Sequence, residues 1–232
     1  MMLFTAALTA VSCGEKEQKQ TEFDYNVESF ADIQILRYKV DGFDELSLKQ
    51  KTFIYYLNEA ALWGRDILFD QNGRYNLEIR KMLEDFYQNY KGDREDKNFK
   101  GVEEYLKRVW FSNGIHHHYG SDKFVPKFER QWFVEQTKCS EEIAEVIFNP
   151  EVMAKKISLA EGVDLLLASA CNYYQGVTQE EAEAFYAEMK AKGDQTHPVM
   201  YGMNSTLIKG KDGKIYEDVW KVGGKYGKAI SK

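Results

Sequence analysis

Residues 79–114 read IRKMLEDFYQNYKGDREDKNFKGVEEYLKRVWFSNG, and this stretch decides the main secondary structure of the chain. Its apolar residues recur at spacings of three and four, which places them on one face of a helix. The charged sequence GDREDKN at 92–98 divides them into two sets, and Asn113-Gly114 ends the second. The two sets are Ile79, Leu83, Phe86 and Tyr90, then Val102, Tyr105, Leu106 and Val109. The stretch therefore predicts two amphipathic helices.

Three further helices are predicted from their terminal residues. Ser and Thr cap a helix by accepting a hydrogen bond from its first turn, and Gln or Glu three residues later completes a capping box. The first helix is predicted to begin at the capping box Ser47–Gln50 and to end at Asn72-Gly73. The second begins at Ser140 and ends at Pro150, and the third begins at the capping box Thr178–Glu181 and ends at Gly193. The predicted inward faces are Phe53, Leu57, Ala60, Gly64 and Ile67, then Ile143, Val146 and Ile147, then Ala182, Phe185 and Met189. We expect the aromatic residues of the helices to lie in the core.

Strands are predicted near both ends of the chain. Residues 30–40 read FADIQILRYKV, in which Leu36, Tyr38 and Val40 alternate with basic residues, as in a half-buried strand. The alternation slips between residues 35 and 36, which indicates a bulge. Residues 205–209 and 214–220 flank the polar loop GKDG and predict a β-hairpin. The chain is therefore predicted to be α+β, mostly helical with a small antiparallel sheet or partial β-barrel.

The composition excludes several classes of protein. The chain has 232 residues, of which 44% are hydrophobic and 14% aromatic, too apolar for a disordered chain. With 31 Lys and Arg against 37 Asp and Glu, its net charge of −6 argues against a nucleic-acid-binding protein. Its three cysteines are too few for a disulfide framework. We expect Cys139 and Cys171 to be buried structural thiols.

The N-terminus has the pattern of a bacterial lipoprotein signal. Residues 1–12 read MMLFTAALTAVS, carry no charge and precede Cys13, although the usual positively charged start is missing. Residues 1–13 are therefore predicted to be a signal with Cys13 as the lipidated residue, residues 14–29 a polar tether, and residues 30–232 the folded part. This predicts attachment to a membrane of the bacterial cell envelope. The alternative is a fortuitous apolar start and a cytoplasmic protein.

The candidate binding residues follow the second helix, in the sequence SNGIHHHYG at 112–120. In an extended segment His116 and His118 share one side, so at most two of the three consecutive histidines could ligate one metal ion. No third ligand has suitable spacing, and no metal site or complete catalytic set is predicted in this chain. Asn113, Gly114, His116 and His118 remain candidates for contacting a peptide backbone or carboxylate. The alternative is that they brace the loop.

Residues 109–128, VWFSNGIHHHYGSDKFVPKF, resemble a segment of the dipeptidyl peptidase III family of zinc metallopeptidases. The sequence FIYYLNEAALWG at 53–64 is similar to the family helix that ends in A-A-x-W/Y-G, and YGMNS at 201–205 resembles the bacterial and plant pattern. The resemblance extends from about Phe30 to Gly227 and is greatest to bacterial members of the Bacteroides type.

The resemblance implies a fold and an activity. Family members have a helical zinc lobe and a lower lobe with a small β-barrel core, on either side of a cleft. The family motifs H-E-x-x-G-H, E-E-x-R-A-[ED] and G-F-I-E-x-Y lie downstream of the matched region in full-length members and do not occur here. The resemblance therefore implies that residues 30–232 are an N-terminal, lower-lobe portion. This chain would hold no zinc and would be inactive alone, its partner being the C-terminal catalytic lobe.

The resemblance also implies a substrate. The full-length protein would be a zinc-dependent exopeptidase that releases dipeptides from the N-terminus of oligopeptides. The lower lobe would hold the peptide as an added strand and recognise its free amine. One alternative is a non-catalytic surface lipoprotein that binds peptide or a partner protein, and another is a structural helical domain. The sequence does not predict the peptide preference or the oligomeric state.

Overall fold

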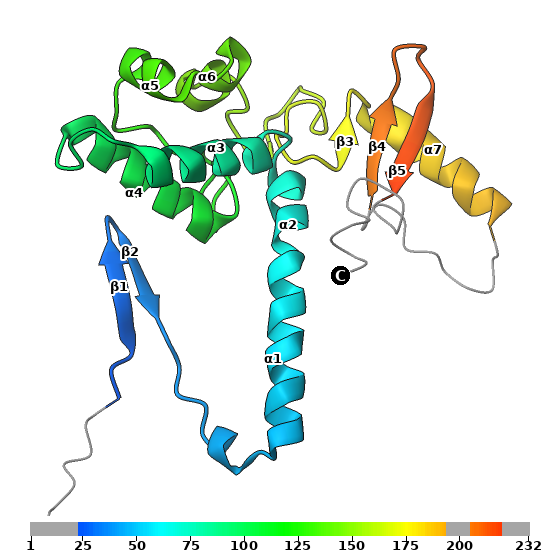
Figure 1. The fold of residues 1–232 in the computed structure, drawn as a ribbon. Helices are drawn as coiled ribbons and strands as arrows, with labels where there is room; N and C mark the ends of the chain where they lie inside the picture. The colour runs from blue at the N-terminus through cyan, green and yellow to red at the C-terminus, as the bar shows by residue number, and fades with distance from the viewer. Residues whose placement is uncertain (1–22, 194–204, 220–232) are drawn as a thin grey trace, which may run out of the picture. The chain divides into compact units, whose positions relative to one another are not determined.

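The computed structural model describes residues 23–193 and 205–219, and it divides the chain into two units, residues 1–45 and 46–232 (Figure 1). Cys13 and the rest of the predicted signal lie outside the described residues, as do residues 201–204 of the motif YGMNS. Within the described ranges, no helix combines the length and the apolar character needed to cross a membrane. The chain is α+β and mostly helical, as predicted.

The first unit contains a β-hairpin rather than the single strand predicted over residues 30–40. Strands β1 (Asn26–Phe30) and β2 (Ile33–Leu36) pair antiparallel, and the 3-10 helix η1 (Phe43–Glu45) follows. Ala31 has a φ of 49°, which reverses the chain directly after β1. A bulge was predicted between residues 35 and 36, which belong to β2. The register shift lies opposite this pair, between Asn26 and Glu28, so the extra residue is on β1. Residues 26–29, predicted to be tether, belong to β1.

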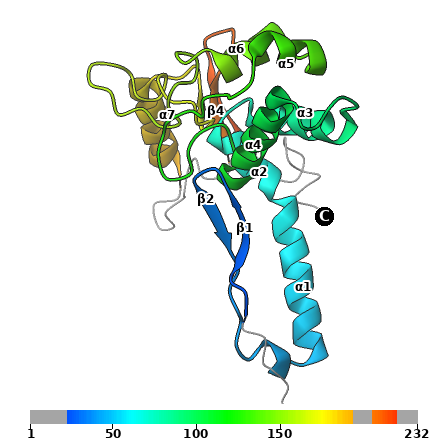
Figure 2. The same ribbon diagram turned by 90° about the vertical axis from the view of Figure 1, so that its left-hand side faces the viewer.

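The second unit begins with two consecutive helices, α1 (Leu48–Trp63) and α2 (Arg65–Asn72). The predicted Ser47–Gln50 capping box is present, and Gly73 follows the last residue of α2. One continuous helix was predicted, but Gly64 ends α1 and α2 starts at the next residue. Both ribbon views show α1 extending away from the helices that follow α2 (Figures 1 and 2).

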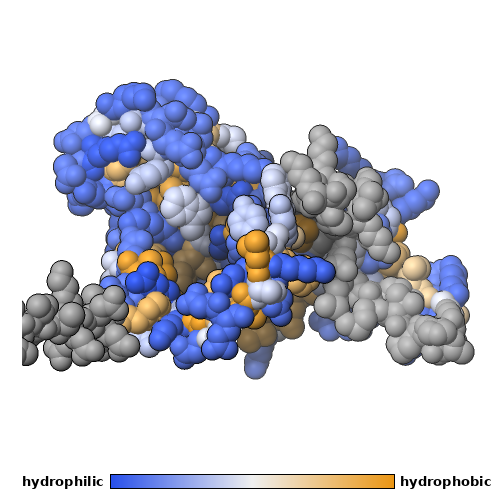
Figure 3. Space-filling model, turned by 60° about the horizontal axis from the view of Figure 1, so that its bottom comes forward, coloured by the Kyte–Doolittle hydropathy of each residue, from blue (hydrophilic) through white to orange (hydrophobic). Residues whose placement is uncertain are grey.

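The prediction that α1 buries an apolar face is wrong in this structure. No residue of α1 is buried, and the side chains of Phe53 and Leu57 are 63% and 53% exposed. Tyr55, Tyr56 and Trp63 are also exposed, although we expected the aromatic residues of the helices in the core. Figure 3 shows apolar residues, in orange, at the surface of the described chain. Within the second unit, α1 extends away from helices α3 to α6 (residues 76–148), so these helices do not cover it.

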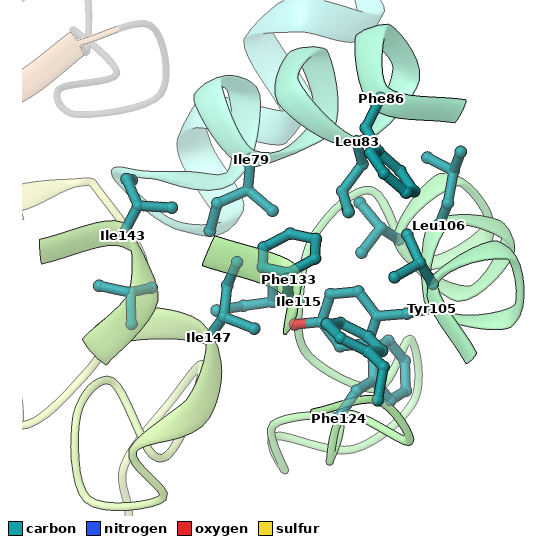
Figure 4. Close-up of a cluster of buried hydrophobic side chains, with 14 of the residues drawn as sticks. Ile79, Leu83, Phe86, Tyr105, Leu106, Ile115, Phe124, Phe133, Ile143 and Ile147 are labelled. Carbon is teal, nitrogen blue, oxygen red and sulfur yellow. The ribbon is translucent and has the colours of Figure 1, made fainter. Parts of the chain in front are cut away.

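Helices α3 (Asn76–Asn89), α4 (Lys97–Ser112), α5 (Arg130–Thr137) and α6 (Glu141–Phe148) enclose the main core. Figure 4 shows side chains from all four helices converging, with Phe133 of α5 between Ile79 of α3 and Ile147 of α6. The apolar faces predicted for α3, α4 and α6 are buried, apart from Tyr90, which is half-buried and packs against this core. Helix α5 was not predicted.

The remaining elements form a small sheet with one covering helix. Strands β4 (Ser205–Lys209) and β5 (Ile215–Val219) form the predicted hairpin, and β3 (Tyr174–Gln175) adds to β4 in parallel, in the order β3-β4-β5. The sheet is therefore mixed rather than purely antiparallel, and the described strands form no closed barrel. Helix α7 (Gln179–Lys192) starts at the predicted Thr178–Glu181 capping box. It packs on the sheet through Ala182 and Leu207.

A chain of buried polar groups joins the helices to the sheet. The side-chain amide of Asn172 donates to Asp70 Oδ2 at 3.1 Å, and its backbone N–H donates to the carbonyl of Gln71 at 2.8 Å. The hydroxyl of Thr206 on β4 in turn donates to the Asn172 carbonyl at 2.8 Å. Because buried polar groups are costly to leave unpaired, these bonds fix the end of α2 against the sheet.

Candidate functional site

The predicted binding residues begin at the C-terminus of α4. Asn113 adopts a left-handed conformation with φ 52° and ends the helix, and its carbonyl accepts a hydrogen bond from Asn72 Nδ2 at 3.0 Å. Gly114 has a φ of 152° and lies so close to Asn76 that a Cβ atom would meet Asn76 Nδ2 at 2.3 Å. Asn76 Oδ1 accepts from the backbone N–H of Ile115 at 3.2 Å. These contacts lock the loop onto the start of α3.

His116 lies in the interior of the second unit. Its ring is 2% exposed, and its Nε2 lies 2.7 Å from the carbonyl of Met153. Because a carbonyl only accepts, Nε2 carries the proton and the neutral ring donates it. Burial lowers the pKa of His116 to about 4, and the positive charges of Lys123 and Lys156 act in the same direction. His116 is therefore neutral at pH 7.

His118 has different surroundings from His116. Its ring is half-buried, stacks on the His117 ring at a centroid distance of 4.4 Å and meets the Phe111 ring edge-on at 4.7 Å. The His116 ring thus contacts a backbone carbonyl, whereas the His118 ring contacts neighbouring aromatic rings. Among the described residues, no group of three or more His, Cys, Asp or Glu side chains could hold a metal ion.

Lys123 was not predicted as a functional or structural centre, yet it connects this segment to α6. Its ammonium group donates to three backbone carbonyls, those of Val146 at 2.9 Å, Asn149 at 2.5 Å and Val152 at 2.6 Å. A cation at the C-terminus of a helix also interacts favourably with the helix dipole. Burial lowers the pKa of Lys123. No sequence signal could reveal this role, because the acceptors are main-chain atoms.

A cavity of about 550 Å³ opens beside these elements. Its walls come from the start of α3, from α6, from the connection between α6 and β3, and from β3 itself. The lining residues are Arg74, Tyr75, Glu142, Glu145, Val146, Val152, Met153, Leu166, Leu167, Ser169, Ala170, Cys171, Asn172, Tyr174, Gln175 and Gly176. None of Asn113, Gly114, His116 and His118 is among these described lining residues. His116 does not line the cavity, but its hydrogen bond to the Met153 carbonyl holds one of the lining residues in place.

One wall of the cavity is charged. Glu142 accepts a hydrogen bond from the Tyr75 hydroxyl and lies 3.9 Å from the guanidinium group of Arg74. Glu145 lies 3.2 Å from Arg130, which also contacts Glu141. Burial and the bond to Glu142 raise the pKa of Tyr75. The cluster of Arg74, Arg130, Glu141, Glu142 and Glu145 contains three carboxylates and two guanidinium groups, so its formal net charge is −1.

Strand β3, at the edge of the described sheet, also lines the cavity. The backbone N–H of Leu207 on β4 donates to the Tyr173 carbonyl at 2.9 Å, so β4 occupies one side of β3. Backbone groups alternate in direction along a strand, and those of Tyr174 therefore point away from β4. Tyr174, Gln175 and Gly176 all line the cavity.

The two described cysteines differ in their surroundings. Cys171 lines the cavity and is only half-buried, and burial raises the pKa of its thiol, which keeps it protonated at neutral pH. A protonated thiol is a poor nucleophile. Cys139 is half-buried and packs against the main core. Both are free thiols, but neither is as deeply buried as predicted.

No protein-family model matches this chain, and no curated protein is significantly similar to it. The assignment of a function therefore depends on the residues of the cavity and on the sequence pattern.

Proposed function

We propose that this chain is the peptide-binding, N-terminal part of a zinc-dependent exopeptidase of the dipeptidyl peptidase III type. The observation that carries the proposal is the cavity, which is lined by two carboxylates and by β3, the edge strand of the sheet that the described residues form. An extended peptide can add to a strand edge through main-chain hydrogen bonds. Its terminal ammonium group can then pair with a carboxylate.

The chain contributes binding and orientation to this activity. Tyr174 offers backbone groups that fix the direction of the peptide, and Glu142 and Glu145 offer acceptors for the free amine. In the resembled mechanism zinc polarises the scissile carbonyl. The resemblance implies that the ion and its ligands belong to the C-terminal catalytic lobe.

The same cavity supports the alternative of a non-catalytic surface lipoprotein that binds peptide. The cavity needs no metal to bind an extended chain with a free amine. The two proposals differ in whether the reading frame supplies the H-E-x-x-G-H motif. We expect the purified chain alone not to cleave a dipeptidyl-arylamide, with or without added zinc. Zinc-dependent turnover by this chain alone would contradict the proposal.

Peptide binding is tested by isothermal titration calorimetry with one tetrapeptide in two forms, free-amine and N-acetylated. We expect acetylation to weaken binding on the order of tenfold, about 1.4 kcal/mol, because it removes the positive charge. The variant Glu142→Gln should reduce this difference between the two forms. Glu135→Gln is the control, because Glu135 is exposed on α5, lies outside the charged cluster and does not line the cavity. Equal affinity for both forms would contradict the proposed role of the carboxylates.

A further inference from the structure

Two residues of the 115–124 loop hold the chain that follows α6. His116 and Lys123 lie opposite each other in an isolated antiparallel bridge. Nε2 of His116 donates to the Met153 carbonyl at 2.7 Å, and the ammonium group of Lys123 donates to three carbonyls between residues 146 and 152. Two side chains of one loop therefore bind four carbonyls of one continuous segment, residues 146–153. These contacts form a clasp.

The same loop also contacts the next residues of the chain. The backbone N–H of Lys156 donates to the Ser121 carbonyl at 2.8 Å, and the ammonium group of Lys155 forms an ion pair with the Asp122 carboxylate. On its other side, the Lys156 carbonyl accepts from the backbone N–H of Cys171, a cavity-lining residue, at 3.1 Å. Residues 151–157 are therefore placed between the 115–124 loop and the cavity.

Met153 has a strained backbone at the point where His116 binds it. Its φ of 50° lies in the left-handed region, which residues other than glycine adopt only at a cost. Met153 also lines the cavity. The clasp thus holds a strained residue in the cavity wall, and release of the clasp lets this residue relax and changes the wall.

His116 is the acid-sensitive member of the clasp. Its ring is 2% exposed, and its buried Nδ1 atom has no hydrogen-bond partner among the described residues. Protonation adds a second N–H to the ring at this atom. The closed clasp would then enclose a positive charge and an unpaired donor, and both are costly to bury. Protonation is therefore favoured only when the ring reaches water.

The charged groups around this ring also affect its protonation. Lys123 of the same loop and Lys156 oppose a positive charge on the ring, and Asp122 favours one. On the α6 side, Glu145 and Glu151 interact with Lys123. Burial is the largest effect, and it lowers the pKa of the ring from 6.5 to about 4 in the closed clasp. In an open clasp the ring is hydrated and its pKa returns to about 6.5.

We propose that the clasp is an acid-sensitive latch, in which protonation of His116 separates residues 151–157 from the 115–124 loop while the α3–α6 core stays folded. Residues 151–157 are the part that moves, because none of them is buried, whereas Ile115 and Phe124 of the loop are buried in the main core. Opening hydrates the imidazolium ring, relaxes Met153 and loosens the cavity wall. The latch goes beyond the proposed function, since it operates with or without a bound peptide.

Native-state hydrogen exchange of the purified chain at pH 7 and pH 5, over a series of low urea concentrations, tests the latch. The reporter is the Lys156 amide, whose bond to Ser121 joins the two segments, and the reference is the Leu106 amide in the buried part of α4. After correction for the intrinsic exchange rate, opening at Lys156 should increase about twentyfold from pH 7 to pH 5, as the pKa values of 6.5 and about 4 require. It should also be nearly independent of urea.

The wild-type measurement is decisive by itself. If the Lys156 amide showed the same urea dependence as the Leu106 amide at both pH values, the clasp would open only together with the core, and the proposal would be overturned.

Two variants test whether His116 is the residue that titrates. His116→Gln keeps an amide donor for the Met153 carbonyl but cannot be protonated, so opening at Lys156 should change less than about twofold between the two pH values. His117→Gln is the matched control, because His117 is the neighbouring histidine and is only half-buried, and it should keep the twentyfold increase. A twentyfold increase in His116→Gln, or its loss in His117→Gln, would overturn the assignment of the latch to His116.

Discussion

Replacing His116 by Gln should flatten the pH dependence of the stability of the chain between pH 8 and pH 5. In the folded state burial lowers the pKa of His116 from 6.5 to about 4. The unfolded state therefore binds more protons than the folded state between these two values, and stability rises with pH across that window. The contribution of neutral His116 is complete above pH 6.5 and is lost as the pH falls towards 4.

The size of the effect follows from the two pKa values. At pH 5 about 97% of unfolded His116 would be protonated, against about 9% of folded His116. This difference lowers the free energy of unfolding by about 2 kcal/mol between pH 8 and pH 5. Gln does not titrate and can still donate an amide N–H towards the Met153 carbonyl, so its own cost should be independent of pH.

Urea denaturation followed by circular dichroism at pH 8, 7, 6 and 5 measures the effect. The matched control is His117→Gln, because His117 is the neighbouring histidine and its side chain is only half-buried. Wild type and His117→Gln should each lose about 2 kcal/mol more than His116→Gln on going from pH 8 to pH 5. Parallel stability curves for all three proteins would refute the assignment of His116 as a buried neutral ring.

Four further changes test other parts of the structure. Lys123→Met should cost about 2–4 kcal/mol in urea denaturation, because three carbonyls lose a charged donor, and an unchanged midpoint would argue against the bonds. Gly114→Ala should lower the melting temperature, at a cost of about 1–3 kcal/mol, because the φ of Gly114 is 152° and Asn76 occupies the space that a Cβ atom would need. A melting temperature equal to that of wild type would contradict this close approach. Leu83→Ala should cost about 2–5 kcal/mol in the same denaturation assay because Leu83 is fully buried, whereas the exposed control Leu159→Ala should cost less than about 0.5 kcal/mol. Cys13→Ala should abolish palmitate incorporation in a bacterial host, and unlabelled, soluble wild-type protein would refute the lipoprotein prediction.

The sequence predicts those elements whose signals are local. The capping boxes at Ser47 and Thr178 involve residues three positions apart, and the structure confirms both. The apolar faces of α3, α4 and α6 are periodic, so their burial could be predicted without knowing their partners. The hairpin of β4 and β5 was likewise predicted from its polar loop.

Other elements have weak signals or depend on distant residues. Helix α5 has eight residues, of which Phe133 alone is buried. A single buried residue produces no repeating apolar pattern in the sequence. Strand β3 has two residues and exists because β4, some 30 residues later, pairs with it. The apolar pattern of α1 predicted a buried face, but periodicity does not show whether a neighbouring element is present to cover it.

The candidate site was the hardest part to predict. Its cavity combines Tyr75, Glu145 and Cys171, which are far apart in the sequence. The predicted residues Asn113, Gly114 and His116 do not line the cavity, and their described contacts are to Asn72, Asn76 and Met153. A binding role for them remains a prediction.

The polar chain through Asp70, Asn172 and Thr206 has a consequence for the order of folding. Asp70 and Asn172 are 102 positions apart, and bringing them together closes a long loop at an entropic cost. The α3–α6 core is built from segments closer in sequence and should form first. Among the described residues, the fully buried apolar side chains between the sheet and α7 are Val177, Ala182 and Leu207, a much smaller core than that of α3–α6. Amide hydrogens of β4 should therefore become protected from exchange after those of α4, once Asn172 has docked on Asp70.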